Sequence, residues 1–317
     1  MSQLTFAEAE FEHKKRKTRR ELFLERMDAL IPWKRLEKKI ARYYAKAGSA
    51  GGRPAYPLPT MLRVHCMQLF YNLSDPAMEE ALYEIASMRK FADLHLDRIP
   101  DETTILNFRH LLERHGLGKT IFKEINAHLK EQGLQLKEGT IVDATIIAAP
   151  SSTKNKAGER DPEMHQTRKG QQWYFGMKAH VGVDESLGLI HSLETTPAHE
   201  ADINVADKLL HGKEKNVWGD AGYQGIEKRP EHEQRKVNWL VGMRPGRRAQ
   251  LPAQSLLAQA EKAKASTRAK VEHSFRYIKL MFGYGKVRYR GLAKNSNRLH
   301  VLAGFANLLM ASKYLRP

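Results

Sequence analysis

The stretch GTIVDATIIAA, residues 139–149, places Asp143 inside an apolar run with several β-branched residues. Such a composition is typical of a buried strand. A carboxylate in this setting is costly unless a cation or hydrogen-bond donors compensate it. The stretch therefore predicts a strand and a compensating partner for Asp143.

Four more strand-like stretches and two helical ones follow this strand. The strand-like stretches are 173–185, 189–196, 216–220 and 237–243, and the helical ones are 201–211 and 255–281. In chain order they give three strands that can form a meander, a helix, two further strands and a helix. This order predicts an α/β fold, an RNase H-like, five-stranded mixed sheet with flanking helices.

Two more acidic residues are expected to approach Asp143 in this fold. The first and fourth strands of such a sheet are parallel neighbours, so Asp143 and Asp220 would project from strands about 4.8 Å apart. Glu272 would arrive on the last helix. There Arg268, Glu272 and Lys279 are spaced by four and seven residues, which places them on one helical face. We therefore expect three carboxylates to meet, with basic side chains beside them.

Taken one at a time, these residues have simpler interpretations. Asp220 in GDAGYQG is typical of a turn, and Glu272 alone indicates little. Lys178 and His180 share the polar side of the second strand and could approach DNA, although a structural histidine is the alternative. The long, basic loop 151–172 predicts a mobile DNA contact, with disorder as its alternative. Only the three acidic contexts together indicate catalysis.

The front of the chain, residues 1–132, has few strand signals and predicts an all-α N-terminal domain. Ser74 and Asp101 are expected to cap two of its helices. Those two helices could form a helix-turn-helix, and ordinary helix packing is the alternative. We expect the catalytic domain to span 133–317, with a short insertion at about 221–255.

Charge narrows the choice of partner. The chain has 53 Lys and Arg against 36 Asp and Glu, a formal net charge of +17, which favours a polyanion such as DNA or RNA. Basic residues are dense between 261 and 298, where Arg276, Lys286 and Arg288 are candidate DNA contacts.

Cys66 is the single cysteine, which excludes an internal disulfide. No apolar stretch reaches the roughly 18 residues of a membrane span. We expect a cytoplasmic, nucleoid-associated protein with no membrane contact.

Three phrases resemble the DDE transposases of bacterial insertion sequences, and in particular the insertion sequence five family: VDATIIAAPSSTKNK (142–156), DPEMHQTRKGQQWYFGMKAH (161–180) and RAKVEHSFRYIK (268–279). Segments 52–75 and 101–112 resemble the helical region that recognises the element's ends in that family. The resemblance implies cleavage and strand transfer of double-stranded DNA. It also implies terminal inverted repeats and target DNA as partners, and a homodimer on paired ends. One departure is Ala265, which stands where related transposases often carry a tyrosine, so the phosphate or base contact of that tyrosine is not expected here.

In such a transposase the three acids would hold two Mg²⁺ ions, for which Mn²⁺ is expected to substitute. Two divalent ions roughly 3.5–4 Å apart activate the attacking oxygen and stabilise the leaving one. Mg²⁺ prefers carboxylate ligands together with waters or substrate oxygens. We expect Asp143 to bridge both ions, with Asp220 on one and Glu272 on the other. Arg268 and Lys279 would neutralise nearby phosphates.

Three other functions account for part of the sequence. A tyrosine recombinase would use His232, Arg235 and Tyr277, but it leaves Asp143 unexplained. An end-binding protein without catalysis would not need all three acids. An RNase H-like nuclease that never joins strands differs from a transposase here only by the family resemblance.

Overall fold

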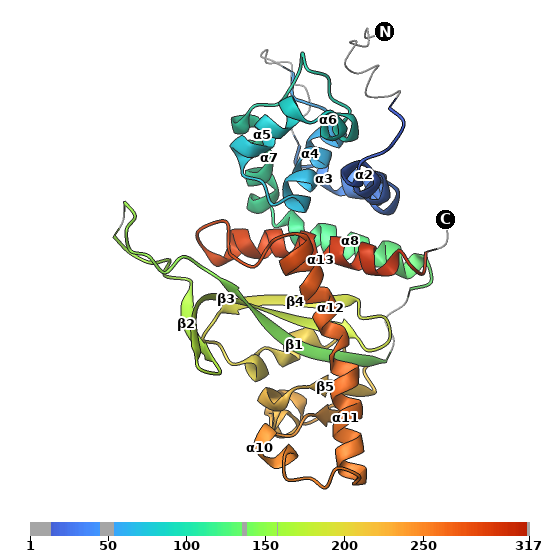
Figure 1. Ribbon diagram of the computed structural model, residues 1–317, viewed down its shortest axis with the longest axis vertical. Coiled ribbons are helices and arrows are strands. Elements are labelled where there is room, and N and C mark those ends of the chain that lie inside the picture. The colour runs from blue at the N-terminus through green and yellow to red at the C-terminus, as the bar shows by residue number, and fades with distance from the viewer. Residues whose placement is uncertain (1–13, 45–53, 135–137, 157, 316–317) are drawn as a thin grey trace. The chain divides into compact units, whose positions relative to one another are not determined.

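The computed structural model describes residues 14–44, 54–134, 138–156 and 158–315. Contacts divide the chain into two compact units, Met1–Ile125 and Asn126–Pro317. Figure 1 shows their elements: the described part of the first unit is helical, and the strands belong to the second. No described helix is both long enough and apolar enough to cross a membrane.

The first unit consists of helices, as its composition predicts. They are α2 (Arg19–Leu30), α3 (Trp33–Ile40), α4 (Leu58–Phe70), α5 (Asp75–Glu84), α6 (Ala86–Ala92), α7 (Glu102–Arg114) and the start of α8 (Leu117–Glu131). α4 is buried along almost its whole length, because it carries apolar residues on every side. It is therefore central to this unit's core, and Cys66 lies within it as a buried thiol.

The two predicted helix caps are present, but the helices that they begin are not consecutive. Ser74 and Asp101 each accept a hydrogen bond from the backbone amide three residues further on. α6 lies between α5 and α7, so no short turn joins the two helices. They pack against each other instead, and the buried Arg109 of α7 forms an ion pair with Asp75 of α5 at 2.7 Å. Ordinary helix packing describes this pair.

The second unit is built on a mixed sheet. Its strands are β1 (Gly139–Ala148), β2 (His165–Lys169), β3 (Gln172–Asp184), β4 (Ile190–Pro197), β5 (Asn216–Gly219) and β6 (Asn238–Val241). β3 pairs antiparallel with β1, β2 and β4, whereas β5 pairs parallel with β1 and with β6. The meander β1–β3–β4, followed by two parallel strands on the other side of β1, is the RNase H-like order that the sequence predicts.

The sheet has six strands among the described residues, one more than predicted. The additional strand, β2, lies in the segment 151–172, which we expected to be a mobile loop. β2 forms a hairpin with the start of β3, where Lys169 pairs with Gln172 around Gly170. Gly170 has a φ of +62°, a conformation that glycine adopts without strain. The sequence did not reveal this strand because HQTRK contains no apolar residue and so no alternation.

Helices cover both faces of the sheet (Figure 1). α9 (Ala206–Leu209) contacts β3 and β4 on one side, while α12 (Lys270–Arg276) contacts β1 and α13 (Leu292–Ala311) contacts β4 on the other. α13 is buried for most of its length, and its Asn307 side chain pairs with the backbone of Ile190 at the start of β4. Because both faces are covered, the polar side of β3 is also buried, and His180 has no exposed surface.

The helix predicted over 255–281 is interrupted twice. It consists of α11 (Leu256–Arg268), α12 and a π-helical turn, η5 (Tyr277–Met281), with Ala269 between the first two. π-Helical turns are rare and frequently occur at functional sites. Arg268, Glu272 and Lys279 consequently belong to three successive elements, α11, α12 and η5.

Candidate active site at the ends of β1 and β5

β5 brings Asp220 to the edge of β1. β5 pairs only with the first three residues of β1 and ends at Gly219, so Asp220 leaves the sheet where this edge of β1 becomes free. Asp143 lies just beyond the paired stretch. Side chains alternate along a strand, and Val142 packs against the residues of α9. Asp143 therefore faces the opposite side, where α12 contacts β1.

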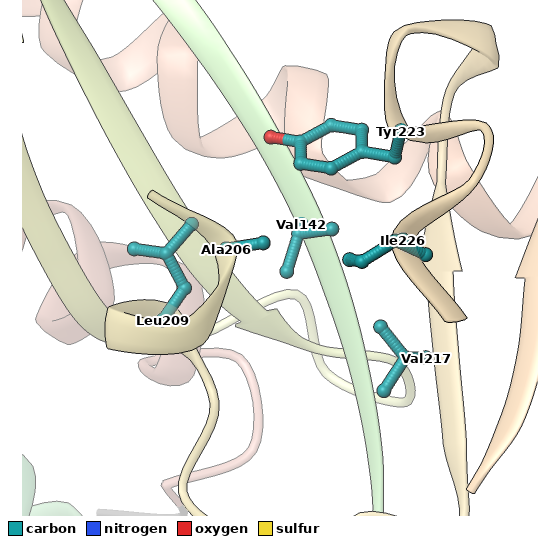
Figure 2. Close-up of a cluster of buried hydrophobic side chains, with 6 residues drawn as sticks. All are labelled: Val142, Ala206, Leu209, Val217, Tyr223 and Ile226. Carbon is teal, nitrogen blue, oxygen red and sulfur yellow. The ribbon is translucent and has the colours of Figure 1, made fainter. Parts of the chain in front are cut away.

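A buried apolar cluster anchors the two strand ends. Figure 2 shows its six side chains, which come from β1, β5, α9 and the segment after Asp220: Val142, Ala206, Leu209, Val217, Tyr223 and Ile226. Burying a large apolar side chain stabilises the fold by about 1.5–3 kcal/mol. The turn that carries Asp220 is thus held against β1 by packing that does not involve the carboxylate itself.

Asp143 is half-buried and close to other charges. Its Oδ1 accepts a hydrogen bond from the backbone N–H of Ala144 at 2.7 Å. Burial raises the pKa of Asp143 to about 6, the bond from Ala144 opposes that rise, and the Asp220 carboxylate adds to it. Arg268 lowers the same pKa, and Asp202 raises it. The Ala144 amide and the charge of Arg268 thus offset only part of the rise in the pKa of Asp143.

Asp220 is the N-cap of a short 3-10 helix, η2 (Ala221–Tyr223). Its Oδ1 accepts a hydrogen bond from the backbone N–H of Gly222 at 2.8 Å, so the turn interpretation is correct locally. In Asp143 and in Asp220 one carboxylate oxygen binds a backbone amide, and the described residues give the other no hydrogen bond. This pair suits a divalent cation, since Mg²⁺ often binds one or two carboxylates and completes its shell with waters and substrate oxygens.

Glu272 is not brought to the two aspartates. It is exposed on α12, and among the described residues no three Asp, Glu, His or Cys side chains are grouped closely enough to hold a metal ion. The charges with the largest effect on the pKa of Asp143 are those of Asp220, Arg268 and Asp202. The meeting of three carboxylates that the sequence predicts is therefore not formed here. Arg268, one helical turn before Glu272, is the residue of this helical segment whose charge lowers the pKa of Asp143.

The Arg268 side chain lies at the carboxyl ends of β5 and β6. A Cβ built on Gly242, directly after β6, would stand only 3.6 Å from Nη1 of Arg268. The Nε of Arg268 is buried and has no hydrogen-bond partner among the described residues. A guanidinium with an unused N–H can donate a hydrogen bond to a phosphate oxygen.

Asp202, with Lys178 and His180, forms a polar group that the sequence analysis did not assign to the site. Lys178 Nζ lies 2.9 Å from Asp202 Oδ1 and donates to the backbone carbonyl of Glu200 at 2.6 Å. Lys178, predicted as a DNA contact, is therefore committed to an internal ion pair. The sequence signal for Asp202 was indirect. Lys178 lies on β3, a strand that is covered on both faces, and a buried lysine requires an acidic partner.

The other predicted DNA contacts are basic side chains on or after α12. Arg276, Lys286 and Arg288 are exposed, and Lys279 is half-buried. Burial lowers the pKa of Lys279, and the positive charge of Lys169 in β2 lowers it further. Two lysines from distant parts of the chain thus share one region, which favours an anion there.

Two residues of the tyrosine-recombinase signature, His232 and Arg235, have structural contacts in the second unit. His232 is buried with its ring 5.0 Å from that of Trp239, and Arg235 forms an ion pair with Asp207 at 2.5 Å. These contacts give both residues a structural explanation.

Two family models match the chain. Residues 134–308 match the family model described as "Transposase DDE domain", and residues 11–111 match the one described as "Transposase domain (DUF772)". Among solved structures, the chain is similar to the one titled "Crystal structure of the Mos1 Strand Transfer Complex". The identity is 12%, the match covers 87% of this chain and 82% of that one, and the TM-score is 0.19.

Proposed function

The chain belongs to the transposase DDE domain family, and from this premise we propose that Asp143, Asp220 and Glu272 are its catalytic residues. The protein is a DNA transposase that cleaves and transfers DNA strands, and its family uses divalent metal ions. The observation that carries the residue assignment is the approach of Asp143 and Asp220 at the free edge of β1. Two carboxylates that repel each other there favour a bound cation.

We propose that two Mg²⁺ ions bind, and that Mn²⁺ substitutes for them. When bound, such ions activate the attacking oxygen and stabilise the leaving one. Asp143 would hold both ions and Asp220 one, through carboxylate oxygens that the backbone amides leave unused. The N–H groups of Ala144 and Gly222 orient the two carboxylates before the substrate arrives, which limits the reorganisation needed at the reacting phosphate.

Glu272 is proposed as the third acid, which requires α12 to shift when DNA binds. The interruptions at Ala269 and at η5 lie on either side of Glu272 and allow such a shift without breaking a long regular helix. In the shifted arrangement Arg268 would exchange Asp143 for a DNA phosphate.

The proposed DNA contacts are the basic side chains around this site: Arg268, Arg276, Lys279, Lys286 and Arg288. They suit phosphates, because contacts to the backbone of DNA position a protein without reading its sequence. Lys178 is left out because of its ion pair with Asp202.

We further propose that the helical region, residues 1–132, recognises the terminal inverted repeats of an insertion sequence five element. The catalytic domain would span 133–317, with an insertion at about 221–255. Two copies would act as a homodimer on paired ends, because strand transfer needs both ends together. A protein with these substrates would work in the cytoplasm, associated with the nucleoid.

The test is strand joining by the purified full-length protein, with labelled element ends and a target plasmid. We expect joining that requires Mg²⁺ or Mn²⁺ and is lost in Asp143→Asn, Asp220→Asn and Glu272→Gln, while binding to the ends persists. The matched control is Asp207→Asn, which alters an aspartate of the same unit that pairs with Arg235. Joining by any of the three variants at the wild-type rate would refute the assignment.

The same assay separates the alternatives. A nuclease would cleave the ends without joining them to the plasmid. A recombinase would work in chelator and leave a phosphotyrosine link, which protease treatment of the labelled DNA would reveal.

A further inference from the structure

Asp202 is brought next to the turn that follows Asp220. It begins a short 3-10 helix, η1 (Asp202–Asn204), and η1 packs against η2, which contains Tyr223. Two segments that leave different strands, β4 and β5, therefore meet beside the candidate site. Asp202 is also one of the charges that raise the pKa of Asp143.

The Asp202 carboxylate is held in place by β3. Lys178 Nζ lies 2.9 Å from its Oδ1, and His180 Nδ1 lies 3.6 Å from the same oxygen. The side chain of Asp202 keeps 29% of its surface exposed, whereas that of His180 keeps none. The carboxylate is thus fixed from one side only, and that side is shielded from bulk solvent.

The hydrogen bonds of His180 determine which of its nitrogens carries the proton. Its Nε2 lies 2.8 Å from Thr196 Oγ1, and the Thr196 hydroxyl donates to the carbonyl of Pro197 at 3.1 Å. Because that hydroxyl has one proton, Nε2 must be the donor to it. Burial lowers the pKa of His180 to about 4, so the ring is neutral and Nδ1 is a bare acceptor. Nδ1 faces another acceptor, Asp202 Oδ1, and it has no hydrogen-bond partner among the described residues.

Tyr223 supplies an unused donor in the same place. Its ring is fully buried, and its hydroxyl has no hydrogen-bond partner in the part of the chain that the structure describes. In Figure 2 the hydroxyl points away from Ile226. After burial, the charges that most raise the pKa of Tyr223 are those of Asp202, Asp143 and Asp220, in that order. A buried hydroxyl without a partner is costly, and η2, which carries Tyr223, packs against η1, which carries Asp202, so a polar ligand between them would complete the group.

We propose that Asp202, His180 and Tyr223 form a positioning centre for Asp220, completed by one buried water. The water accepts a hydrogen bond from the Tyr223 hydroxyl and donates its two protons to His180 Nδ1 and Asp202 Oδ1. His180 Nδ1 and the Tyr223 hydroxyl, which have no other partner among the described residues, then each have one, and Asp202 Oδ1 gains a second beside Lys178. The centre ties η1 to η2 and so fixes the turn that presents Asp220. The inference rests on the proposed roles of Asp143 and Asp220.

Two conservative variants test the centre. Tyr223→Phe removes the donor and keeps the packed ring, and Asp202→Asn removes the charge and keeps the shape. Loss of a group that orients metal ligands typically weakens metal binding about 10- to 100-fold. We expect each variant to weaken Mn²⁺ binding by the full-length protein, without DNA, by about 10-fold or more. Free Mn²⁺, followed by electron paramagnetic resonance, gives this affinity independently of catalysis.

The double variant shows whether the residues act as one group. If they do, the double variant Asp202→Asn with Tyr223→Phe will bind Mn²⁺ no more weakly than the weaker-binding single variant. If the two residues act independently, the fold-losses in affinity of the single variants will multiply in the double variant. Asp207→Asn, which alters an ion-paired aspartate of the neighbouring α9, is the matched control and should bind Mn²⁺ like the wild type. Thermal unfolding of each variant identifies any that fails to fold, in which case Tyr223→Phe alone decides.

The outcomes separate this inference from the proposed function. If Asp143→Asn loses Mn²⁺ binding while Tyr223→Phe and Asp202→Asn stay within about twofold of wild type, the positioning centre is wrong and the catalytic assignment stands. If Asp143→Asn itself binds Mn²⁺ normally and still joins strands, the proposed function fails first. Multiplying effects in the double variant would also overturn the centre.

Discussion

Replacing Asp143 with asparagine should stabilise the protein at neutral and alkaline pH while it abolishes activity. Burial raises the pKa of Asp143 from 3.8 to about 6, so the folded state disfavours the charged form. Because the folded-state pKa is raised, the contribution of the Asp143 carboxyl to stability is fully present below about pH 4 and is lost as the pH rises through about 6. A shift of about 2 units corresponds to about 3 kcal/mol at pH 8. Because Asp143 is half-buried and water reaches it, we expect Asp143→Asn to raise the free energy of unfolding at pH 8 by only about 1–2 kcal/mol.

The assay is thermal unfolding of the wild type and Asp143→Asn between pH 4 and pH 8. For a unit of this size, 1 kcal/mol moves the Tm by about 2–4 °C, so the variant should melt a few degrees higher at pH 8. The difference should shrink steeply toward pH 4, because the folded state is then protonated and the unfolded state, with a pKa of 3.8, begins to be protonated as well. Asp207→Asn, which loses an ion pair with Arg235, should show no such gain. A variant that is less stable than the wild type at pH 8, or a difference independent of pH, would refute the reasoning.

Three further variants test other parts of the structure. Arg268→Gln should reduce the slope of log affinity for DNA ends against log salt by about 1, measured by fluorescence anisotropy, and an unchanged slope would exclude a phosphate contact. Asn295→Ala should lower the free energy of unfolding, measured in urea, by about 3 kcal/mol. The buried Asn295 amide accepts a hydrogen bond from the Tyr284 hydroxyl and donates to the carbonyls of Tyr289 and Gly291. A loss under about 1 kcal/mol would show that this network contributes little to stability. Arg109→Met should cost about 3–5 kcal/mol in the same measurement, since it leaves two acids of the first unit unpaired, and a neutral result would contradict that expectation.

Much of the fold follows from local patterns. The alternation in 173–185 and the apolar run around Asp143 gave the central strands, and the order of elements gave the parallel pairing of β1 with β5. β2 was not predicted because its five residues, HQTRK, are polar and show no alternation of apolar side chains. Only its backbone pairing with β3 makes it a strand. The interruption at Ala269 also has no local signal, since alanine is a strong helix former and its dihedral angles remain close to helical.

The candidate site was harder to predict than the fold. Asp143 was identified because a carboxylate inside an apolar strand needs compensation, and the structure supplies Arg268. Helical periodicity placed Glu272 on the same face as Arg268, but periodicity does not tell which of two residues one turn apart reaches a given point. Asp202 and Tyr223 were missed because their proximity depends on the packing of η1 against η2, which is a tertiary contact.

The position of Arg268 links metal binding to DNA binding. Asp143, Asp220 and Asp202 bring three negative charges to one region, and the nearby cations are Arg268 and the already paired Lys178. If Arg268 turns to a DNA phosphate, as proposed, the acids lose part of their compensation and their affinity for a divalent cation rises. Coupling between two ligands is reciprocal, so a bound cation must equally release Arg268 for DNA. Under this proposal the same arginine would stabilise the acids before the substrate arrives and would tie the loading of the metal site to the presence of a phosphate.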